Sequence, residues 1–182
     1  MNGLHFLNNT HGCFMTAMGF IYLTNDGGES WQQQKSGVSD ELRRIKFYSE
    51  QFGLAVGLGG MILKTIDGGK SWLRLNDGYQ GDLNKVVFVN QLTGWAFGED
   101  ILHTNDGGES WESQYDGDGM YFTSAKAFDK NNLVAVEGRA VFSSQDGGKA
   151  WEKKASNITF KLSQFVNKHC GWGVSGQKIY RT

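Results

Sequence analysis

The stretch TNDGGESW at residues 24–31 recurs along the chain at a nearly constant interval. It returns as TIDGGKSW at 65–72, as TNDGGESW at 104–111 and, less closely, as SQDGGKAW at 144–151. The aspartates of these boxes, Asp26, Asp67, Asp106 and Asp146, are separated by 41, 39 and 40 residues. A fixed period of this length is typical of proteins built by repeating one supersecondary unit. The repeat therefore decides the fold, and its aspartates form either a repeated site or a repeated turn.

A second marker precedes each box and reveals a fifth copy. It is a phenylalanine followed six residues later by glycine: Phe6 and Gly12, Phe47 and Gly53, Phe88 and Gly94, Phe165 and Gly171. In the fourth repeat Ala127 takes the phenylalanine position, with Phe128 beside it. The fifth copy ends in KIYRT at Thr182, the position equivalent to Thr24. We expect one domain of five units with boundaries near 1–37, 38–79, 80–119, 120–157 and 158–182.

Each unit is predicted to consist of β-strands. Short runs such as those around Ile45, Phe47, Val86 and Phe88 are rich in apolar, β-branched and aromatic residues, without a helical stripe. Three or four short strands in about 40 residues is the pattern of a propeller blade. The pattern predicts an all-β propeller of five blades, the last one incomplete. This pattern is compatible with a closed five-bladed ring, with a part of a larger propeller, and with an open edge that pairs with another chain.

The box has a physical account as a turn. Glycines after the aspartate supply the positive φ angles of a tight hairpin, and the carboxylate can accept backbone N–H bonds from the same turn. Ser30, Ser71 and Ser110 can add a hydroxyl bond, whereas Ala150 cannot. Structural roles are therefore expected for the aspartates and for the tryptophans Trp31, Trp72, Trp111 and Trp151. Copies spaced one blade apart point away from one another and do not converge on one substrate.

The box resembles the Asp-box, or BNR, motif of sialidase-like propellers. The longer pattern from Phe88 to Trp111 is similar to the photosystem II stability/assembly-factor-like repeats. The resemblance covers almost the whole chain and implies that the box is a structural turn at the propeller periphery. Such repeats occur in sialidases, assembly chaperones, secreted binding proteins and phage proteins.

Sialidase activity is not expected. The resemblance to sialidases implies three substrate-binding arginines and an arginine–isoleucine–proline signature. The chain has five arginines and no proline, and Lys46 follows Ile45 where the signature has proline. No other catalytic motif is present, and no cofactor is expected.

Composition gives further bounds. The formal net charge of -1 gives no reason to expect nucleic acid as a partner. No apolar run is long enough to span a membrane, and the N-terminus lacks a secretory signal, which suggests a cytoplasmic or virion-associated protein.

Candidate binding residues lie at the non-repeated positions of the innermost strands. Arg43, Arg44, Lys46, Lys85, Lys126 and Lys161 could line the channel with positive charge and attract an acidic partner segment. Alternatively, they pair with Asp40, Glu41 or Asp82. Tyr79, Tyr115 and Tyr121 lie in the connections between blades, where they either contact a protein or glycan partner or pack within the loops.

Two metal hypotheses receive less weight. If the ring closes, His11 and Cys13 approach His169 and Cys170, which offers zinc ligands or a disulfide. The alternative is two reduced, half-buried cysteines. The run DGDG at 116–119 is partly similar to a calcium loop, but Met120 breaks the pattern, and an exposed turn is preferred.

The leading functional hypothesis is a non-enzymatic propeller scaffold for protein binding or assembly, possible in a phage or bacterial accessory protein. The alternative is a glycan-binding, lectin-like propeller, which should repeat polar pocket residues from blade to blade. The repeated positions outside the box are instead apolar or glycine. A sialidase-like glycoside hydrolase is the third hypothesis.

Overall fold

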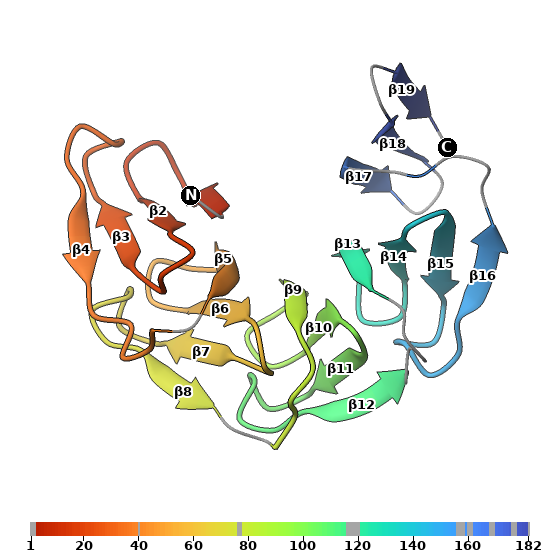
Figure 1. Ribbon diagram of the computed structural model, residues 1–182, viewed down its shortest axis with the longest axis horizontal. Coiled ribbons are helices and arrows are strands. Elements are labelled where there is room, and N and C mark those ends of the chain that lie inside the picture. The colour runs from red at the N-terminus through yellow and green to blue at the C-terminus, as the bar shows by residue number, and fades with distance from the viewer. Residues whose placement is uncertain are drawn as a thin grey trace.

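The computed structural model contains five antiparallel sheets and describes residues 3–39, 41–75, 78–115, 121–155, 159, 162–167, 170–175 and 178–181 (Figure 1). We call the sheets blades 1 to 5. Blade 1 consists of β1 (Gly3–Phe6), β2 (Gly12–Met15), β3 (Ile21–Thr24) and β4 (Gln32–Gln34). Blade 2 consists of β5 (Leu42–Phe47), β6 (Gly53–Gly57), β7 (Ile62–Thr65) and β8 (Leu73–Leu75).

The other three blades repeat this plan. Blade 3 consists of β9 (Leu83–Phe88), β10 (Gly94–Gly98), β11 (Ile101–Thr104) and β12 (Glu112–Tyr115). Blade 4 consists of β13 (Phe122–Ala127), β14 (Leu133–Glu137), β15 (Ala140–Ser144) and β16 (Glu152–Ala155). Blade 5 has the three strands β17 (Leu162–Asn167), β18 (Cys170–Ser175) and β19 (Lys178–Arg181). Strands neighbour one another in chain order within every blade, so the predicted all-β architecture is confirmed. The five sheets, the last with three described strands, are consistent with the predicted blades.

The two sequence markers meet inside blades 1, 2 and 3. A Cβ atom added to Gly53 would lie 2.9 Å from the ring of Phe47, so the ring covers a position that only glycine can occupy. The same ring lies edge-on to the box tryptophan, with centroids 5.9 Å apart for Phe47 and Trp72. Phe6 with Trp31 and Phe88 with Trp111 repeat this geometry at 6.1 and 6.0 Å. The repeated F-x5-G pattern is therefore a packing unit that joins the inner strands to the box.

The blades are held together by apolar layers between them. One layer packs Met15 and Ile21 of blade 1 against Ile45 and Leu63 of blade 2. Comparable layers join blades 2 and 3, 3 and 4, and 4 and 5. Contacts between inner strands likewise link each blade to the next, through β1 with β5, β5 with β9, β9 with β13, and β13 with β17.

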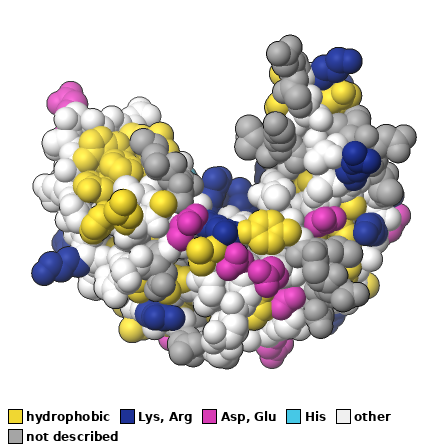
Figure 2. Space-filling model, viewed as in Figure 1, with side chains coloured by type: hydrophobic (Ala, Val, Ile, Leu, Met, Phe, Trp, Pro, Cys, Tyr) yellow, Lys and Arg dark blue, Asp and Glu magenta, His cyan; other side chains and the backbone are white. Residues whose placement is uncertain are grey.

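The five blades form an open arc and not a closed ring. Blades 1 and 5 lie at the two ends of the arc in Figure 1, with a wide gap between them that is also open in the space-filling view of Figure 2. Five blades close only if each is rotated by a fifth of a turn from the last. The layers that join neighbouring blades are built from bulky side chains, as in the layer of Trp95, Phe97, Phe122 and Phe142.

The open ends expose positions that are buried elsewhere. Ile45 in β5 is 2% exposed, whereas Leu4 at the same register of β1 is 54% exposed. Ile62 in β7 is 1% exposed, whereas Ile179, its equivalent in β19, is 74% exposed. Among the described residues, no helix is long and apolar enough to cross a membrane.

Candidate functional site

The box aspartates are fully engaged in their own turns. In blade 1, the Asp26 carboxylate accepts bonds from the Ser30 hydroxyl (2.5 Å), the Thr24 hydroxyl (2.6 Å) and the Ser30 amide (3.0 Å). Blades 2 and 3 repeat these bonds. In blade 4, Asp146 keeps the bonds from the Ser144 hydroxyl and the Ala150 amide, at 2.8 and 3.0 Å.

These bonds change the acidity of the box. The hydroxyl and amide of Ser71 both donate to Asp67 and lower the pKa of its carboxyl to about 2. The box turn is also fixed from outside, because the Gly68 amide donates to the Gln51 carbonyl at 3.0 Å. The geometry is that of a structural turn, repeated in separate blades.

A basic surface lies on the inner strands, facing the hollow of the arc. Arg44 and Lys46 come from β5 and Lys85 comes from β9, and we call these three residues the inner basic surface. Figure 2 shows Lys and Arg side chains gathered at the concave inner edge of the molecule. The ion pairs recorded among the described residues involve Arg43, Lys64 and Lys154, and none involves these three cations.

The cations of this surface are close enough to affect one another. Burial, together with the charges of Arg44 and Lys46, lowers the pKa of Lys85 to about 8. Burial also lowers the pKa of Lys46, with further contributions from Arg44 and Lys126. An anion placed here would meet partly desolvated positive charge, which strengthens its binding.

Two of the expected cations are engaged in contacts between blades. Arg43 donates to Asn84 Oδ1 at 2.7 Å and lies 3.3 Å from an Asp82 carboxylate oxygen. Lys126 donates to the Phe165 carbonyl of blade 5 at 2.6 Å. The alternative of pairing with Glu41 or Asp82 thus describes Arg43, but not Arg44, Lys46 or Lys85.

One inner residue was missed by sequence reasoning. His5 occupies the position of Lys46 and Lys126, one residue before the phenylalanine position, and its Nε2 lies 3.0 Å from the Phe47 carbonyl of blade 2. Burial lowers the pKa of His5, and the charges of Lys46 and Arg44 lower it further. The sequence signal that could have identified His5 is its position one residue before the phenylalanine marker, which it shares with Lys46 and Lys126.

The candidate tyrosines take part in packing. Tyr79 packs against the layer between blades 2 and 3. Tyr115 lies 6.0 Å from the Phe122 ring and 5.9 Å from the Phe142 ring. Tyr121 is 37% exposed, and the Arg43 guanidinium lies 5.6 Å from the centre of its ring.

The remaining candidates are separated or lie outside the described residues. Cys13 is buried against blade 2, Cys170 lies at the start of β18, and both are free thiols. Asp40, Lys161, His169 and the run at 116–119 are outside the described part of the chain. Within the part that is described, no group of three or more His, Cys, Asp or Glu side chains could hold a metal.

Comparison with known proteins gives a family match. The model of the family described as Photosynthesis system II assembly factor YCF48 matches residues 1–77 and 29–175. No curated protein sequence is detectably similar to the chain.

Several solved structures share the fold at low identity. A structure of YCF48 bound to D1 peptide is 16% identical, with a TM-score of 0.56 over 97% of this chain and 90% of that one. YCF48 from Cyanidioschyzon merolae is 15% identical, with a TM-score of 0.67 over 93% of this chain and 64% of that one. An ancestral GH74 enzyme is 15% identical, with a TM-score of 0.79, but the match spans 94% of this chain and only 27% of the enzyme.

Proposed function

Because the chain belongs to the family of Photosynthesis system II assembly factor YCF48, we propose that it is a non-enzymatic scaffold that binds an acidic segment of a protein partner. The proposed site is the inner basic surface of Arg44, Lys46 and Lys85. The three cations lie on neighbouring blades, and none has a carboxylate partner within 4.0 Å among the described residues. This uncompensated charge is the observation that carries the proposal.

The acidic nature of the partner follows from electrostatics. Lys46 and Lys85 have lowered pKa values because each is partly buried among like charges. A carboxylate brought between them compensates this repulsion, so binding should be coupled to full protonation of Lys85. A chain end or an Asp- or Glu-rich segment supplies such carboxylates on a flexible backbone that can enter the hollow.

Protein binding is favoured over the glycan and hydrolase alternatives. A solved structure contains YCF48 bound to D1 peptide, which supports a peptide as the kind of ligand for this family member. The box carboxylates, which recur in every complete blade, are occupied by their own turns and do not offer repeated sugar pockets. The proposal concerns the scaffold role and does not include an origin in a phage.

The test is the affinity for a fluorescent acidic peptide, measured by anisotropy against a peptide with amides in place of its carboxylates. We expect Arg44→Gln and Lys85→Gln each to weaken binding by about tenfold, and added salt to weaken it further. The matched controls are Arg74→Gln in β8 and Lys149→Gln in the blade 4 box, both exposed and outside the inner strands. Equal binding of the two peptides, or equal losses in the controls, would refute the proposal.

Binding should also depend on pH. Since the pKa of Lys85 is lowered to about 8, the inner basic surface loses charge as the pH rises from 7 to 9. We expect affinity for the acidic peptide to decrease over this range in the native protein and to change less in Lys85→Gln. Hydrolysis of soluble polysaccharides by the purified protein would contradict the non-enzymatic assignment.

A further inference from the structure

Each interior blade has two apolar faces, and each face packs on a neighbouring blade. In blade 2, Leu54 and Ile62 belong to the layer shared with blade 3, and we call this side of a blade its forward face. Ile45 and Leu63 belong to the layer shared with blade 1, and we call this side the rear face. Inside the arc, the forward face of one blade therefore meets the rear face of the next.

Blade 5 has a forward face that is open to solvent. The register of its strands places Trp172 at the position of Leu54 and Ile179 at the position of Ile62. The side chains of Trp172 and Ile179 are 41% and 74% exposed, whereas their equivalents in blade 2 are 0% and 1% exposed. Blade 5 thus carries the apolar surface of an interior blade without a neighbour on it.

Blade 1 has an open rear face. Leu4 and Phe6 are 54% and 40% exposed, whereas their equivalents in blade 2 are 2% and 8% exposed. The Phe14 ring enlarges this face and stacks on the Tyr22 ring, with centroids 4.6 Å apart. The other blades have a small residue at the position of Phe14, namely Ala55, Ala96, Ala135 and Gly173. Blade 1 therefore offers more apolar area at its open face than an interior blade has there.

The two open faces of one molecule do not reach each other. Blades 1 and 5 lie on opposite sides of the gap in the arc (Figure 1). A second copy of the chain carries the missing partner of both faces, because it offers a rear face to blade 5 and a forward face to blade 1.

Charged residues at the two ends match a pair found inside the arc. Between blades 2 and 3, Lys64 Nζ of β7 lies 2.5 Å from Glu109 Oε1 of the next box. Arg181 has the position of Lys64 in blade 5, and Glu29 has the position of Glu109 in the box of blade 1. Neither Arg181 nor Glu29 takes part in an ion pair recorded for the described residues. The forward end of one copy and the rear end of another are therefore complementary in charge.

Opposite charges at these two positions are not a general property of the repeat. Between blades 1 and 2 the positions hold Leu23 and Lys70, and between blades 3 and 4 they hold His103 and Lys149. The end positions thus follow the interface between blades 2 and 3, where the ion pair forms. This match favours a second copy over an unrelated partner.

The inner strands offer a further contact of a kind already present in the molecule. His5 Nε2 lies 3.0 Å from the Phe47 carbonyl of the next blade, and Lys126 donates to the next blade in the same way. Gln164 has the equivalent position in blade 5, one residue before the phenylalanine marker, and it is exposed. Its amide can donate to the Phe6 carbonyl of a second copy.

We propose that the forward face of blade 5 binds the rear face of blade 1 in a second copy of the chain, so that copies associate head to tail. The apolar side chains of the two faces pack against each other, and Arg181 pairs with Glu29 at their edge. Because each copy has one face of each kind, the contact is heterologous and produces a closed ring or an open filament. Association follows mass action, so both faces are open in dilute protein.

The experiment measures the molar mass of the native protein by sedimentation velocity over about a hundredfold range of concentration. We expect the mass to rise above that of one chain as the concentration increases. A native protein that remains a single chain over the whole range would overturn the proposal.

Two variants distinguish a head-to-tail contact from a symmetric one. Ile179→Glu and Leu4→Glu each place a charge on one end face, at positions that are 74% and 54% exposed, so both variants should fold and remain single chains. An equal mixture should form a complex with one copy of each variant, because one retains its rear face and the other its forward face. Self-association of either variant alone, or the absence of a complex in the mixture, would overturn the proposal.

Charge reversal tests the pairing at the edge. Arg181→Glu and Glu29→Arg should each weaken self-association by about tenfold, and the double variant should recover most of the loss. The matched control is Lys149→Glu, which changes the same box position in blade 4 and should leave self-association unchanged. A double variant as weak as the single variants, or an equal loss in the control, would contradict the proposed arrangement.

The end faces are separate from the inner basic surface. Ile179→Glu should therefore bind the acidic peptide as the native protein does, and Lys85→Gln should self-associate as the native protein does. A joint loss of both properties in either variant would contradict the assignment of two separate surfaces.

Discussion

Blade interfaces and arc ends contain the same residue positions in opposite environments. Ile62 in blade 2 and Ile179 in blade 5 occupy the same register of the third strand, yet one is 1% and the other 74% exposed. Trp95 and Trp172 likewise share a position in the second strand and are 0% and 41% exposed. The difference teaches that a blade does not bury its own faces. Burial, and with it most of the stability, comes from the neighbouring blade.

Truncation of the two tryptophans should give the largest difference in stability between a blade interface and an arc end. Trp95→Ala should lower the free energy of unfolding by about 3–5 kcal/mol, since it leaves a cavity and an unpaired amide. Trp172→Ala should cost about 1 kcal/mol or less, because much of its ring already contacts water. Denaturant unfolding measures both values. Equal losses would mean that the free face of blade 5 is covered in solution.

The paired isoleucines repeat the comparison without a hydrogen bond. We expect Ile62→Ala to lower the free energy of unfolding by about 2–4 kcal/mol and Ile179→Ala to lower it by about 0.5 kcal/mol or less. The apolar layer between blades 2 and 3 contains Ile62, whereas Ile179 faces the open end. A loss of more than about 2 kcal/mol at Ile179 would contradict the comparison.

The contribution of a box turn to stability should be the same in an end blade and in an interior blade. The Ser30 hydroxyl in end blade 1 and the Ser110 hydroxyl in interior blade 3 donate to their box aspartates at 2.5 and 2.6 Å. Ser30→Ala and Ser110→Ala should therefore lower the melting temperature by similar amounts, about 1–3 °C each. Ala150→Ser should raise it, since it supplies the bond that blade 4 lacks. Clearly unequal losses would show that the turns depend on the interface.

Protonation of a box aspartate at low pH should lower the stability of each blade less than the substitutions above. The pKa of Asp67 is lowered to about 2 by its bonds with Ser71, so the folded state holds this carboxylate more firmly than the unfolded chain does. The corresponding stability is present above about pH 4 and is lost as the pH falls toward 2. Denaturant midpoints measured over this range should decrease in the native protein. The decrease should be smaller in Asp67→Ala, and an identical slope would remove the box from the acid response.

Much of the fold could be predicted because its markers act locally. Three features lie within one blade: the glycine under the ring of Phe47, the edge-on contact of that ring with Trp72, and the turn around Asp67. The spacing of these residues in the sequence therefore predicts the contacts directly. The open arc could not be predicted in this way. The angle between blades depends on side chains that meet across an interface, and these do not recur from one repeat to the next.

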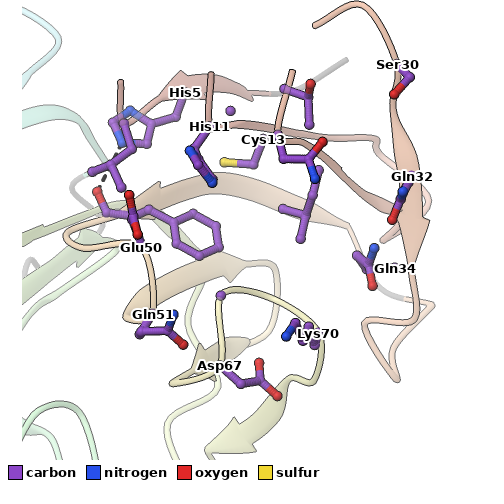
Figure 3. A pocket seen from close by; sticks show the side chains of 17 residues that line it. His5, His11, Cys13, Ser30, Gln32, Gln34, Glu50, Gln51, Asp67 and Lys70 are labelled. Carbon is purple, nitrogen blue, oxygen red and sulfur yellow. Dashed lines mark hydrogen bonds between the residues drawn. The ribbon is translucent and has the colours of Figure 1, made fainter. Parts of the chain in front are cut away.

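The candidate site was predictable only in part, for the same reason. Arg44 and Lys46 stand on the inner strand as expected, but Arg43 contacts Asn84 and Asp82 at a point where the register between β5 and β6 shifts, which the sequence pattern did not indicate. A pocket between blades 1 and 2 is lined by residues of both blades, among them Gln34 and Gly68 (Figure 3). Their spacing in the sequence does not show that they meet, because they come from different repeats.

The inner strands also set the order in which the molecule comes apart. His5 bonds to blade 2, and Lys126 bonds to blade 5, so these contacts tie the end blades to their neighbours. Detaching blade 1 or blade 5 breaks one interface, whereas opening a central blade breaks two. Amide hydrogens of the end blades should therefore exchange with solvent through local fraying, and those of β10 should exchange only when the whole arc unfolds.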